Sequence, residues 1–124
     1  MPDNPPLIGL DLLEPDRLAA RLERRPALRE TLFTAGELAY AEAQPNPILH
    51  LTARFCAKEA IIKALGIDGW DPLEIEVTGG GERTGVHLHG DVARRADDLG
   101  VVVNISMTHV AAMAGAVAHA LPRV

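Results

Sequence analysis

One predicted helix in this chain is too apolar to lie on a protein surface, although it carries four charged side chains. Asn46-Pro47 offers a cap and a first-turn proline, and Gly66 offers a stop, so we predict a helix of about 19 residues. Apolar side chains on nearly all sides are typical of a buried helix. The charged residues are Arg54, Lys58, Glu59 and Lys63. Because an unpaired buried charge is very costly, these residues predict paired partners, a metal or an anionic ligand.

Helical spacing divides the four charges into two rows. Positions four apart share a face, so Arg54 and Lys58 form one row and Glu59 and Lys63 form the other. The two lysines are the only ones in the chain. A simpler interpretation is one exposed Glu-Lys pair that stabilises the helix by ~0.2–0.5 kcal/mol. Spacing alone favours neither interpretation.

Length and composition limit the class of protein. The 124 residues predict one domain, spanning 1–124, with room for a single core. Neither a membrane span nor a signal peptide is predicted, and the single cysteine, Cys56, is typical of the reducing cytoplasm, where we expect the protein. The net charge of −5 argues against nucleic acid as the main partner. Aromatic residues are few, so a core of small aliphatic side chains favours extra burial through a homo-oligomer.

The predicted elements are typical of an α+β fold, with an antiparallel sheet that has its helices packed on one face. In chain order we predict a strand, three helices, two strands, a helix and two strands. Their ranges are 7–13, 15–25, 34–43, the central helix between Asn46 and Gly66, 73–78, 86–89, 91–99, 101–108 and 110–121, with a glycine-rich connection at 79–81.

Acidic residues in two parts of the chain predict a cation site. Asp11 interrupts an apolar strand, Glu14 follows three positions later, and Glu59 lies on the charged helix. A few carboxylates combined with the phosphate oxygens of a substrate suit Mg²⁺, and the cations of the same helix suit phosphates. That combination is typical of phosphoryl-group transfer. A solvated or helix-capping role for Asp11 is the alternative.

Arginines recur along the first predicted helix. Arg17, Arg21 and Arg24 (or Arg25) are three or four positions apart and therefore lie along one stripe. In a net-acidic chain a basic stripe predicts a docking face for an acidic partner. A solvated helix face balanced by Asp16, Glu23 and Glu30 is the alternative, and it is favoured without further evidence because runs of charge usually are such faces.

A polar cluster at 106–109 lies between two apolar strands and ends in His109. Strand ends often carry functional residues, although a satisfied turn fits the pattern equally well. The remaining histidines predict no special role, because His87 and His89 read as surface residues and His50 and His119 are isolated.

Four segments together resemble the holo-acyl-carrier-protein synthase family of small 4′-phosphopantetheinyl transferases. They are Ile-Gly-Leu-Asp-Leu-Leu-Glu at 8–14, Phe-Thr followed by Glu-Leu at 33–38, Arg-Phe-Cys-Ala-Lys-Glu-Ala with a later lysine at 54–63, and Ile-Ser-Met-Thr-His at 105–109. The resemblance implies the 4′-phosphopantetheinyl transferase fold and a homotrimer with a site at each interface. It also implies transfer of 4′-phosphopantetheine from coenzyme A to a serine of an acidic apo-acyl carrier protein of fatty-acid or polyketide synthesis, with release of adenosine 3′,5′-bisphosphate.

The same resemblance implies roles for individual residues. Asp11 and Glu59 would ligate Mg²⁺ and, with Lys63, form the catalytic centre. The residues implied to bind coenzyme A are Arg54, Lys58, Lys63, Ser106, Thr108 and His109. Arg54, Thr108 and His109 would hold its nucleotide end from a neighbouring subunit. The residues implied to dock the carrier protein are Arg17, Arg21 and Arg24, because Arg17 falls where the family carries a docking arginine.

Departures from the family pattern leave alternatives open. Segment 66–72 is short and acidic where the family usually has a longer glycine-containing loop, 82–84 replaces its Gly-Lys/Arg-Pro turn, and Val110 stands where it often has threonine or an acid. The main alternative is a non-catalytic homologue that binds coenzyme A or a carrier protein. A metal-dependent phosphohydrolase is a second alternative, although it normally needs more carboxylates or histidines.

Overall fold

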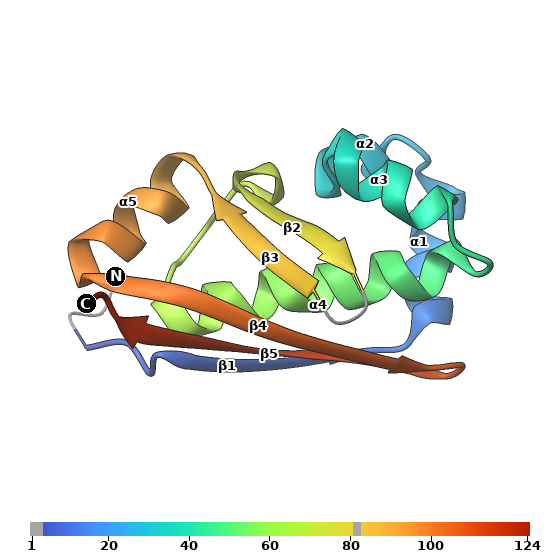
Figure 1. Ribbon diagram of the computed structural model, residues 1–124. Coiled ribbons are helices and arrows are strands. Elements are labelled where there is room, and N and C mark those ends of the chain that lie inside the picture. The colour runs from blue at the N-terminus through green and yellow to red at the C-terminus, as the bar shows by residue number, and fades with distance from the viewer. Residues whose placement is uncertain (1–3, 81–82) are drawn as a thin grey trace.

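The structure, a computed structural model, describes residues 4–80 and 83–124 and has an α+β architecture. The elements are β1 (Ile8–Leu13), α1 (Pro15–Arg24), α2 (Leu28–Leu32), α3 (Ala35–Glu42), α4 (Pro47–Leu65), the short 3₁₀ helix η1 (Pro72–Glu74), β2 (Ile75–Gly80), β3 (Arg83–Leu88), α5 (Gly90–Leu99), β4 (Val101–Val110) and β5 (Met113–Pro122) (Figure 1). Part of the predicted connection at 79–81, and residue 82 of the departing turn, lie outside the described residues. None of the described helices is long and apolar enough to cross a membrane.

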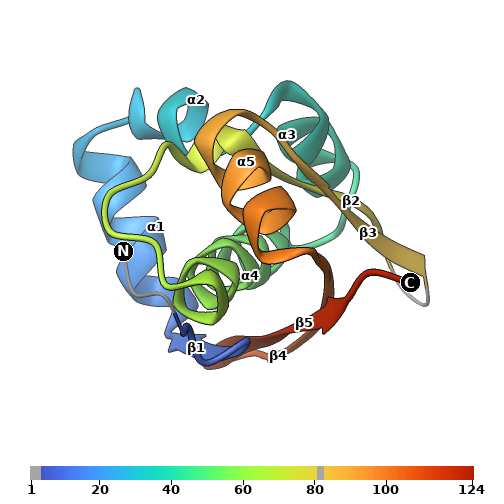
Figure 2. The same cartoon turned by 90° about the vertical axis from the view of Figure 1, so that its left-hand side faces the viewer.

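The strands form two antiparallel sheets where the sequence predicts one. Strands β1, β5 and β4 make a three-stranded sheet in that order, and β2 and β3 make a separate pair. A groove of about 300 Å³ separates β3 from β4, and its lining includes Val86, Leu88 and Val103. These side chains pack against the core, and no main-chain ladder joins β3 to β4 in the described parts of the chain. The predicted packing on one face is confirmed, because the helices lie on the same side of the three-stranded sheet (Figure 2).

Helix α4 is the centre of the core, as its apolar composition predicts. It lies across the inner face of the three-stranded sheet, and the side chains of Ala57, Ala60 and Ile61 are fully buried. The helix runs from Pro47 to Leu65 and ends at the left-handed Gly66, so its predicted bounds are confirmed, but the Asn46 side chain makes no capping hydrogen bond. Its small residues allow strand and helix to approach closely.

Gly9 makes the closest of these approaches possible. A Cβ atom added at Gly9 would lie 2.0 Å from the carbonyl oxygen of Ala60, far inside van der Waals contact. Strand β1 can therefore lie against α4 only because this position has no side chain. The contact places Asp11, two residues further along β1, beside the outer turns of α4.

Local signals predict most elements, although several bounds differ: β3 covers Arg83–Leu88 where 86–89 is predicted, and β5 begins at Met113 where 110 is predicted. The capping box of α3 is present: Thr34 Oγ1 accepts a hydrogen bond from Glu37 N, and Glu37 Oε1 accepts one from Thr34 N. Helix α2 is missed, because Pro26 reads as a stop and the helix begins again at Leu28. Strand β2 starts later than predicted because η1 occupies the residues before Ile75.

Candidate functional site

The two rows of charge on α4 face different surroundings. Arg54 is 2% exposed and Lys58 is fully buried, whereas the side chain of Lys63 is 53% exposed and Glu59 is partly buried. The row of Arg54 and Lys58 contacts groups from β2, η1 and the end of α2, and the row of Glu59 and Lys63 lies beside β1. The division predicted from helical spacing is therefore present, and only one row is open to solvent.

Asp11, Glu59 and Lys63 form one cluster, hereafter the carboxylate centre. Lys63 Nζ donates to Asp11 Oδ1 at 3.2 Å and to the carbonyl oxygen of Leu10 at 2.9 Å. Burial raises the pKa of Glu59, the negative charge of Asp11 raises it further, and the cations of Lys63 and Arg21 oppose the shift. The two carboxylates thus lie close enough to repel one another, with Lys63 and Arg21 beside them.

The carboxylate centre has the donor set of a small hard cation. Asp11 and Glu59 supply carboxylate oxygens, and no group of three or more His, Cys, Asp or Glu side chains within the described residues could hold a metal ion. Glu14, which the sequence places with them, is exposed at the N-cap of α1. A site of two carboxylates that leaves its other positions to water and substrate phosphate suits Mg²⁺. Mutual repulsion of the two acids favours a bound cation as well.

Cys56, the single cysteine of the sequence, lies next to the carboxylate centre and is not a reactive thiol. Burial raises the pKa of the Cys56 thiol to about 12, and the charge of Asp11 and a hydrogen bond with its carboxylate act in the same direction. Cys56 Sγ also donates to the carbonyl oxygen of Ala114 at 3.8 Å. The thiol therefore stays protonated and fills space in the core.

The structure corrects the prediction that Lys58 binds phosphate. Lys58 Nζ lies 2.7 Å from Glu37 Oε1 and donates to the carbonyl oxygens of Leu32 at 2.7 Å and Pro72 at 2.9 Å. An ammonium group has three protons, so this buried amine has none left for a ligand. Glu37 is satisfied in turn, since its Oε2 accepts from Val77 N at 2.8 Å. Lys58 joins α2, α3, α4 and η1, and its role is structural.

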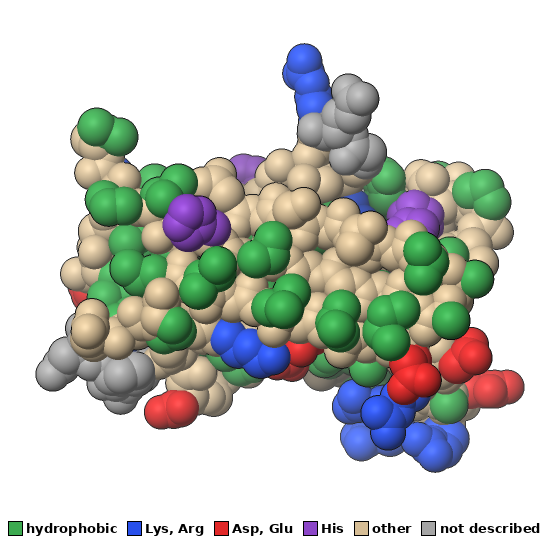
Figure 3. All heavy atoms as spheres, turned by 90° about the horizontal axis from the view of Figure 1, so that it is seen from below, with side chains coloured by type: hydrophobic (Ala, Val, Ile, Leu, Met, Phe, Trp, Pro, Cys, Tyr) green, Lys and Arg blue, Asp and Glu red, His purple; other side chains and the backbone are tan. Residues whose placement is uncertain are grey.

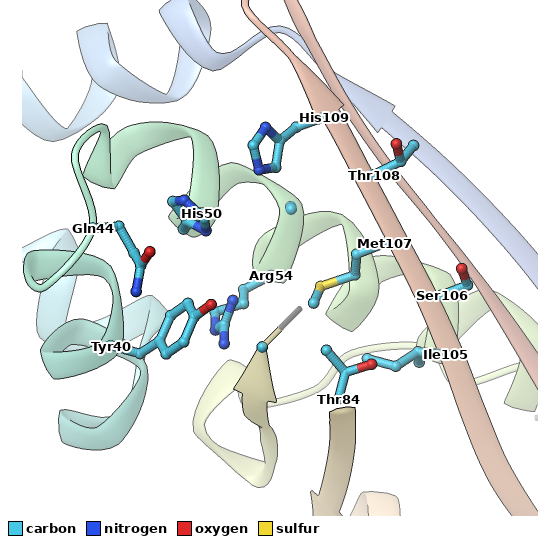
Figure 4. A pocket seen from close by; sticks show the side chains of 12 residues that line it. Tyr40, Gln44, His50, Arg54, Thr84, Ile105, Ser106, Met107, Thr108 and His109 are labelled. Carbon is cyan, nitrogen blue, oxygen red and sulfur yellow. The ribbon is translucent and has the colours of Figure 1, made fainter. Parts of the chain in front are cut away.

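Arg54 lies at a cavity of about 680 Å³ between α3, α4 and β4, hereafter the α3–α4–β4 cavity (Figure 4). Its guanidinium stacks 4.1 Å above the centroid of the Tyr40 ring and donates from Nη2 to the carbonyl oxygen of Gly79. Its Nε atom is buried and has no hydrogen-bond partner among the described residues. Burial lowers the pKa of Arg54. The contacts with Tyr40 and Gly79 hold the Arg54 guanidinium in place, and its Nε–H remains available to a ligand.

Three predicted ligands of coenzyme A on β4 divide between its two faces. Ser106, Thr108 and His109 all border the α3–α4–β4 cavity. The His109 ring points into it, while the Ser106 and Thr108 side chains point away, toward the outer face of the sheet (Figure 4). Strand alternation explains the difference. Sequence reasoning missed His50, which lies with its ring centroid 4.9 Å from that of His109.

The carboxylate centre and the cavity do not meet within one chain. Asp11 is on β1 at one edge of the three-stranded sheet, and His109 is on β4 at the other edge. Arg54 and Lys63 leave α4 in opposite directions, because nine helical positions correspond to about half a turn more than two full turns. The residues predicted to act together thus form two separate clusters.

The predicted arginine stripe borders the carboxylate centre. Arg17, Arg21 and Arg24 are exposed on α1 and line a surface groove of about 430 Å³ with Leu13 and Ala20. The positive charge of Arg21 also acts on Glu59 across the gap between α1 and α4. A partner bound along this groove would therefore reach the carboxylate centre.

Known proteins share both the sequence and the fold. A sequence model of the 4′-phosphopantetheinyl transferase superfamily matches residues 7–112. The chain is 42% identical over 115 residues to the holo-[acyl-carrier-protein] synthase of Moorella thermoacetica, covering 89% of each protein. Over 114 residues it is 42% identical to the protein of that name from Streptomyces avermitilis, covering 89% of this chain and 92% of the other. Its fold matches an ACPS–CoA complex from Chronobacterium ammoniagenes with a TM-score of 0.83 at 26% identity, covering 95% of this chain and 98% of that one.

Proposed function

The chain belongs to the 4′-phosphopantetheinyl transferase superfamily, and on this basis we propose that it is a holo-acyl-carrier-protein synthase. The reaction would transfer 4′-phosphopantetheine from coenzyme A to a serine of an apo-acyl carrier protein and release adenosine 3′,5′-bisphosphate. The observation that carries the proposal is the carboxylate centre, which joins Asp11 and Glu59 to Lys63 beside an arginine-lined groove. The coenzyme A complex of the Chronobacterium ammoniagenes structure supports coenzyme A as the donor.

The carboxylate centre supplies the groups that the transfer needs. Asp11 and Glu59 would hold Mg²⁺, which would supply positive charge against the pyrophosphate of coenzyme A. Glu59, directly or through a water molecule, would accept the proton of the acceptor serine. The serine oxygen would attack the phosphorus that carries pantetheine, and the bond from that phosphorus to the nucleotide phosphate would break. Lys63 would stabilise the charge on the departing nucleotide phosphate.

A homotrimer would bring the two separate clusters together. The outer face of the three-stranded sheet carries exposed hydrophobic side chains (Figure 3). On β1 they include Ile8 at 57%, Leu10 at 62% and Leu12 at 61% exposure. A contiguous apolar face of this kind is typical of a protein interface. Contact across it would place the cavity residues Arg54 and His109 of one chain beside the carboxylate centre of a neighbour.

The groove on α1 is the proposed docking site for the carrier protein. Its arginines offer positive charge to an acidic partner, and Leu13 and Ala20 offer an apolar floor. Because Arg21 also acts on Glu59, a serine presented along the groove would arrive next to the proposed base.

The test is the intact mass of an apo-acyl carrier protein incubated with this protein, coenzyme A and Mg²⁺, beside an Asp11→Ala control. Addition of one 4′-phosphopantetheine, absent with the variant, is expected. No addition to any of several carrier proteins would favour a non-catalytic homologue. Release of adenosine 3′,5′-bisphosphate without any carrier protein would favour a phosphohydrolase.

A further inference from the structure

Two imidazole rings and one guanidinium lie together at one end of the α3–α4–β4 cavity. The His50 ring on α4 meets the His109 ring on β4 edge to face, with centroids 4.9 Å apart at 72°. On its other side His50 meets the Tyr40 ring, with centroids 5.7 Å apart at 70°. Arg54, one turn further along α4, stacks on that same Tyr40 ring. Figure 4 shows the four side chains grouped at one end of the cavity.

This group of basic side chains has no acidic counterpart in the described parts of the chain. The ion pairs found there do not include His50, Arg54 or His109. Glu37 is the acid whose charge acts on Arg54, and its carboxylate is already engaged by Lys58. The buried Nε of Arg54 also lacks a hydrogen-bond partner. Basic groups without counter-charge around an open cavity fit an anionic ligand.

We propose that His50 is a further ligand-binding residue, which holds the 3′-phosphate of coenzyme A together with His109 and Arg54. The inference rests on the proposed function, because it takes coenzyme A as the substrate. Of the phosphates of coenzyme A, the 3′-phosphate is a monoester and carries close to two negative charges at neutral pH, whereas the pyrophosphate must reach the carboxylate centre. The dianion is therefore the part of the molecule that best matches several basic groups in one place.

The surroundings of His50 make this binding depend on pH. Burial lowers the pKa of His50 below its usual value of 6.5, and the positive charges of His109 and Arg54 lower it further. The groups that face His50 are Tyr40 from α3, Arg54 from its own helix and His109 from β4. Without a bound anion His50 is therefore mostly neutral at pH 7.

A bound phosphate dianion reverses the balance of charge around His50. It offsets the repulsion from His109 and Arg54, so the pKa of His50 rises on binding. Between the free and bound pKa values, binding takes up a proton. Affinity for the 3′-phosphate is therefore highest below the free pKa and falls as the pH rises through the bound pKa.

The test compares coenzyme A with 3′-dephospho-coenzyme A by isothermal titration calorimetry between pH 6.5 and 8. We expect the preference of the wild-type protein for coenzyme A to fall as the pH rises, by up to about tenfold per pH unit. In His50→Phe, which keeps an aromatic ring against Tyr40, we expect a smaller preference at pH 6.5 and a weaker pH dependence. Protonation of the phosphate itself acts equally on both proteins and cancels in the comparison. His87→Phe, an exposed position on β3, is the matched control and should behave as wild type.

Nuclear magnetic resonance on the wild-type protein tests the same inference without a variant that must fold. The pKa of His50 should rise when adenosine 3′,5′-bisphosphate is added and stay unchanged with adenosine 5′-monophosphate. An unchanged His50 pKa, or a His50→Phe protein with the wild-type ratio at every pH, would overturn the inference. Either result beside normal modification of a carrier protein would leave the proposed transferase intact. A rise in the His50 pKa without any carrier modification would instead support the phosphate site and count against the transferase.

Discussion

Lys63 Nζ lies 3.2 Å from Asp11 Oδ1 and ties the exposed side of α4 to β1. The pair places a cation against one of two neighbouring carboxylates, so part of the repulsion between Asp11 and Glu59 is already balanced. If Mg²⁺ took the place of this cation at Asp11, the Lys63 ammonium would be free to turn toward a phosphate, because more than half of its side chain is exposed.

Asp11→Asn should abolish transfer without unfolding the protein. The substitution keeps the size of the side chain and removes a proposed metal ligand, so we expect the rate of carrier modification to fall by about 10²-fold or more. Stability should change by less than ~1 kcal/mol, because the Lys63 side chain of the ion pair is 53% exposed and the substitution also removes repulsion with Glu59. Asp97→Asn, which removes the partner of Arg123 on the surface, is the matched control. Equal rates for the two variants would contradict a role for Asp11 in the reaction.

Lys58→Met should destabilise the protein by about 3–5 kcal/mol, because it leaves the charge of Glu37 buried and unpaired. Urea unfolding measures the loss. The double variant Lys58→Met/Glu37→Leu should recover part of it, since neither charge then remains. Arg29→Met, at an exposed pair with Glu42, should have little effect. A stable Lys58→Met protein with weakened coenzyme A binding would instead support the phosphate role that the sequence predicts.

Glu59→Gln should stabilise the metal-free protein near neutral pH while stopping transfer. The pKa of Glu59 is raised in the folded state, so the native protein binds more protons than the unfolded chain and loses stability as the pH rises above 4.5. The variant lacks this loss. Its melting temperature in the presence of a chelator should exceed that of wild type at pH 7, and the difference should shrink toward pH 4. A difference in melting temperature that stays the same from pH 4 to pH 7 would show that the titration of Glu59 does not affect stability.

Reversal of charge at Arg17 and Arg21 should weaken carrier-protein docking selectively. We expect the KM for the carrier to rise by about tenfold or more at low salt, and the effect to diminish as salt screens the charges. The preference for coenzyme A over 3′-dephospho-coenzyme A should stay unchanged, because the α3–α4–β4 cavity that would hold the 3′-phosphate is lined by no residue of α1. Arg94→Glu, at an exposed site on α5, is the control for net charge. Unchanged steady-state kinetics in the double variant would exclude the groove as the docking site.

Leu10→Lys should dissociate the proposed trimer. A charge at this exposed position on β1 opposes contact between apolar sheet faces, so light scattering should report a monomer and transfer should fall. Leu73→Lys, at a partly exposed position outside that sheet, should leave the assembly unchanged. Mixed subunits give a second check. Asp11→Ala and His109→Ala chains, each inactive alone, should regain activity together if one site uses both chains.

The sequence predicts well the structural features that depend on residues close together in the chain. Proline and glycine mark the ends of α4, and the pairing of Thr34 with Glu37 marks the start of α3. The charged rows of α4 likewise follow from helical geometry alone. Residue types alone predict a cation site among Asp11, Glu14 and Glu59, and the resemblance to a known family selects Asp11 and Glu59 as its ligands.

Contacts between distant parts of the chain explain what the sequence does not predict. The sequence predicts Glu37 only as part of a capping box. In the structure the same carboxylate also pairs with the buried Lys58. In the sequence His50 looks isolated and His109 ends a polar cluster between two strands, and only the packing of α4 and β4 around one cavity brings their rings together. The division of the strands into two sheets, with a groove between β3 and β4, depends on how distant segments pack, which no local pattern records.

The contact between Gly9 and Ala60 sets the distance between β1 and α4, the two elements that carry Asp11 and Glu59. Because the strand touches the helix main chain directly, the separation of the two acids is set by backbone thickness and not by the packing of any side chain. Aliphatic residues elsewhere in the core can exchange volume with their neighbours, but a single added methyl group at Gly9 would widen the gap between β1 and α4. Other core positions can therefore change in sequence without moving β1, provided that position 9 remains glycine.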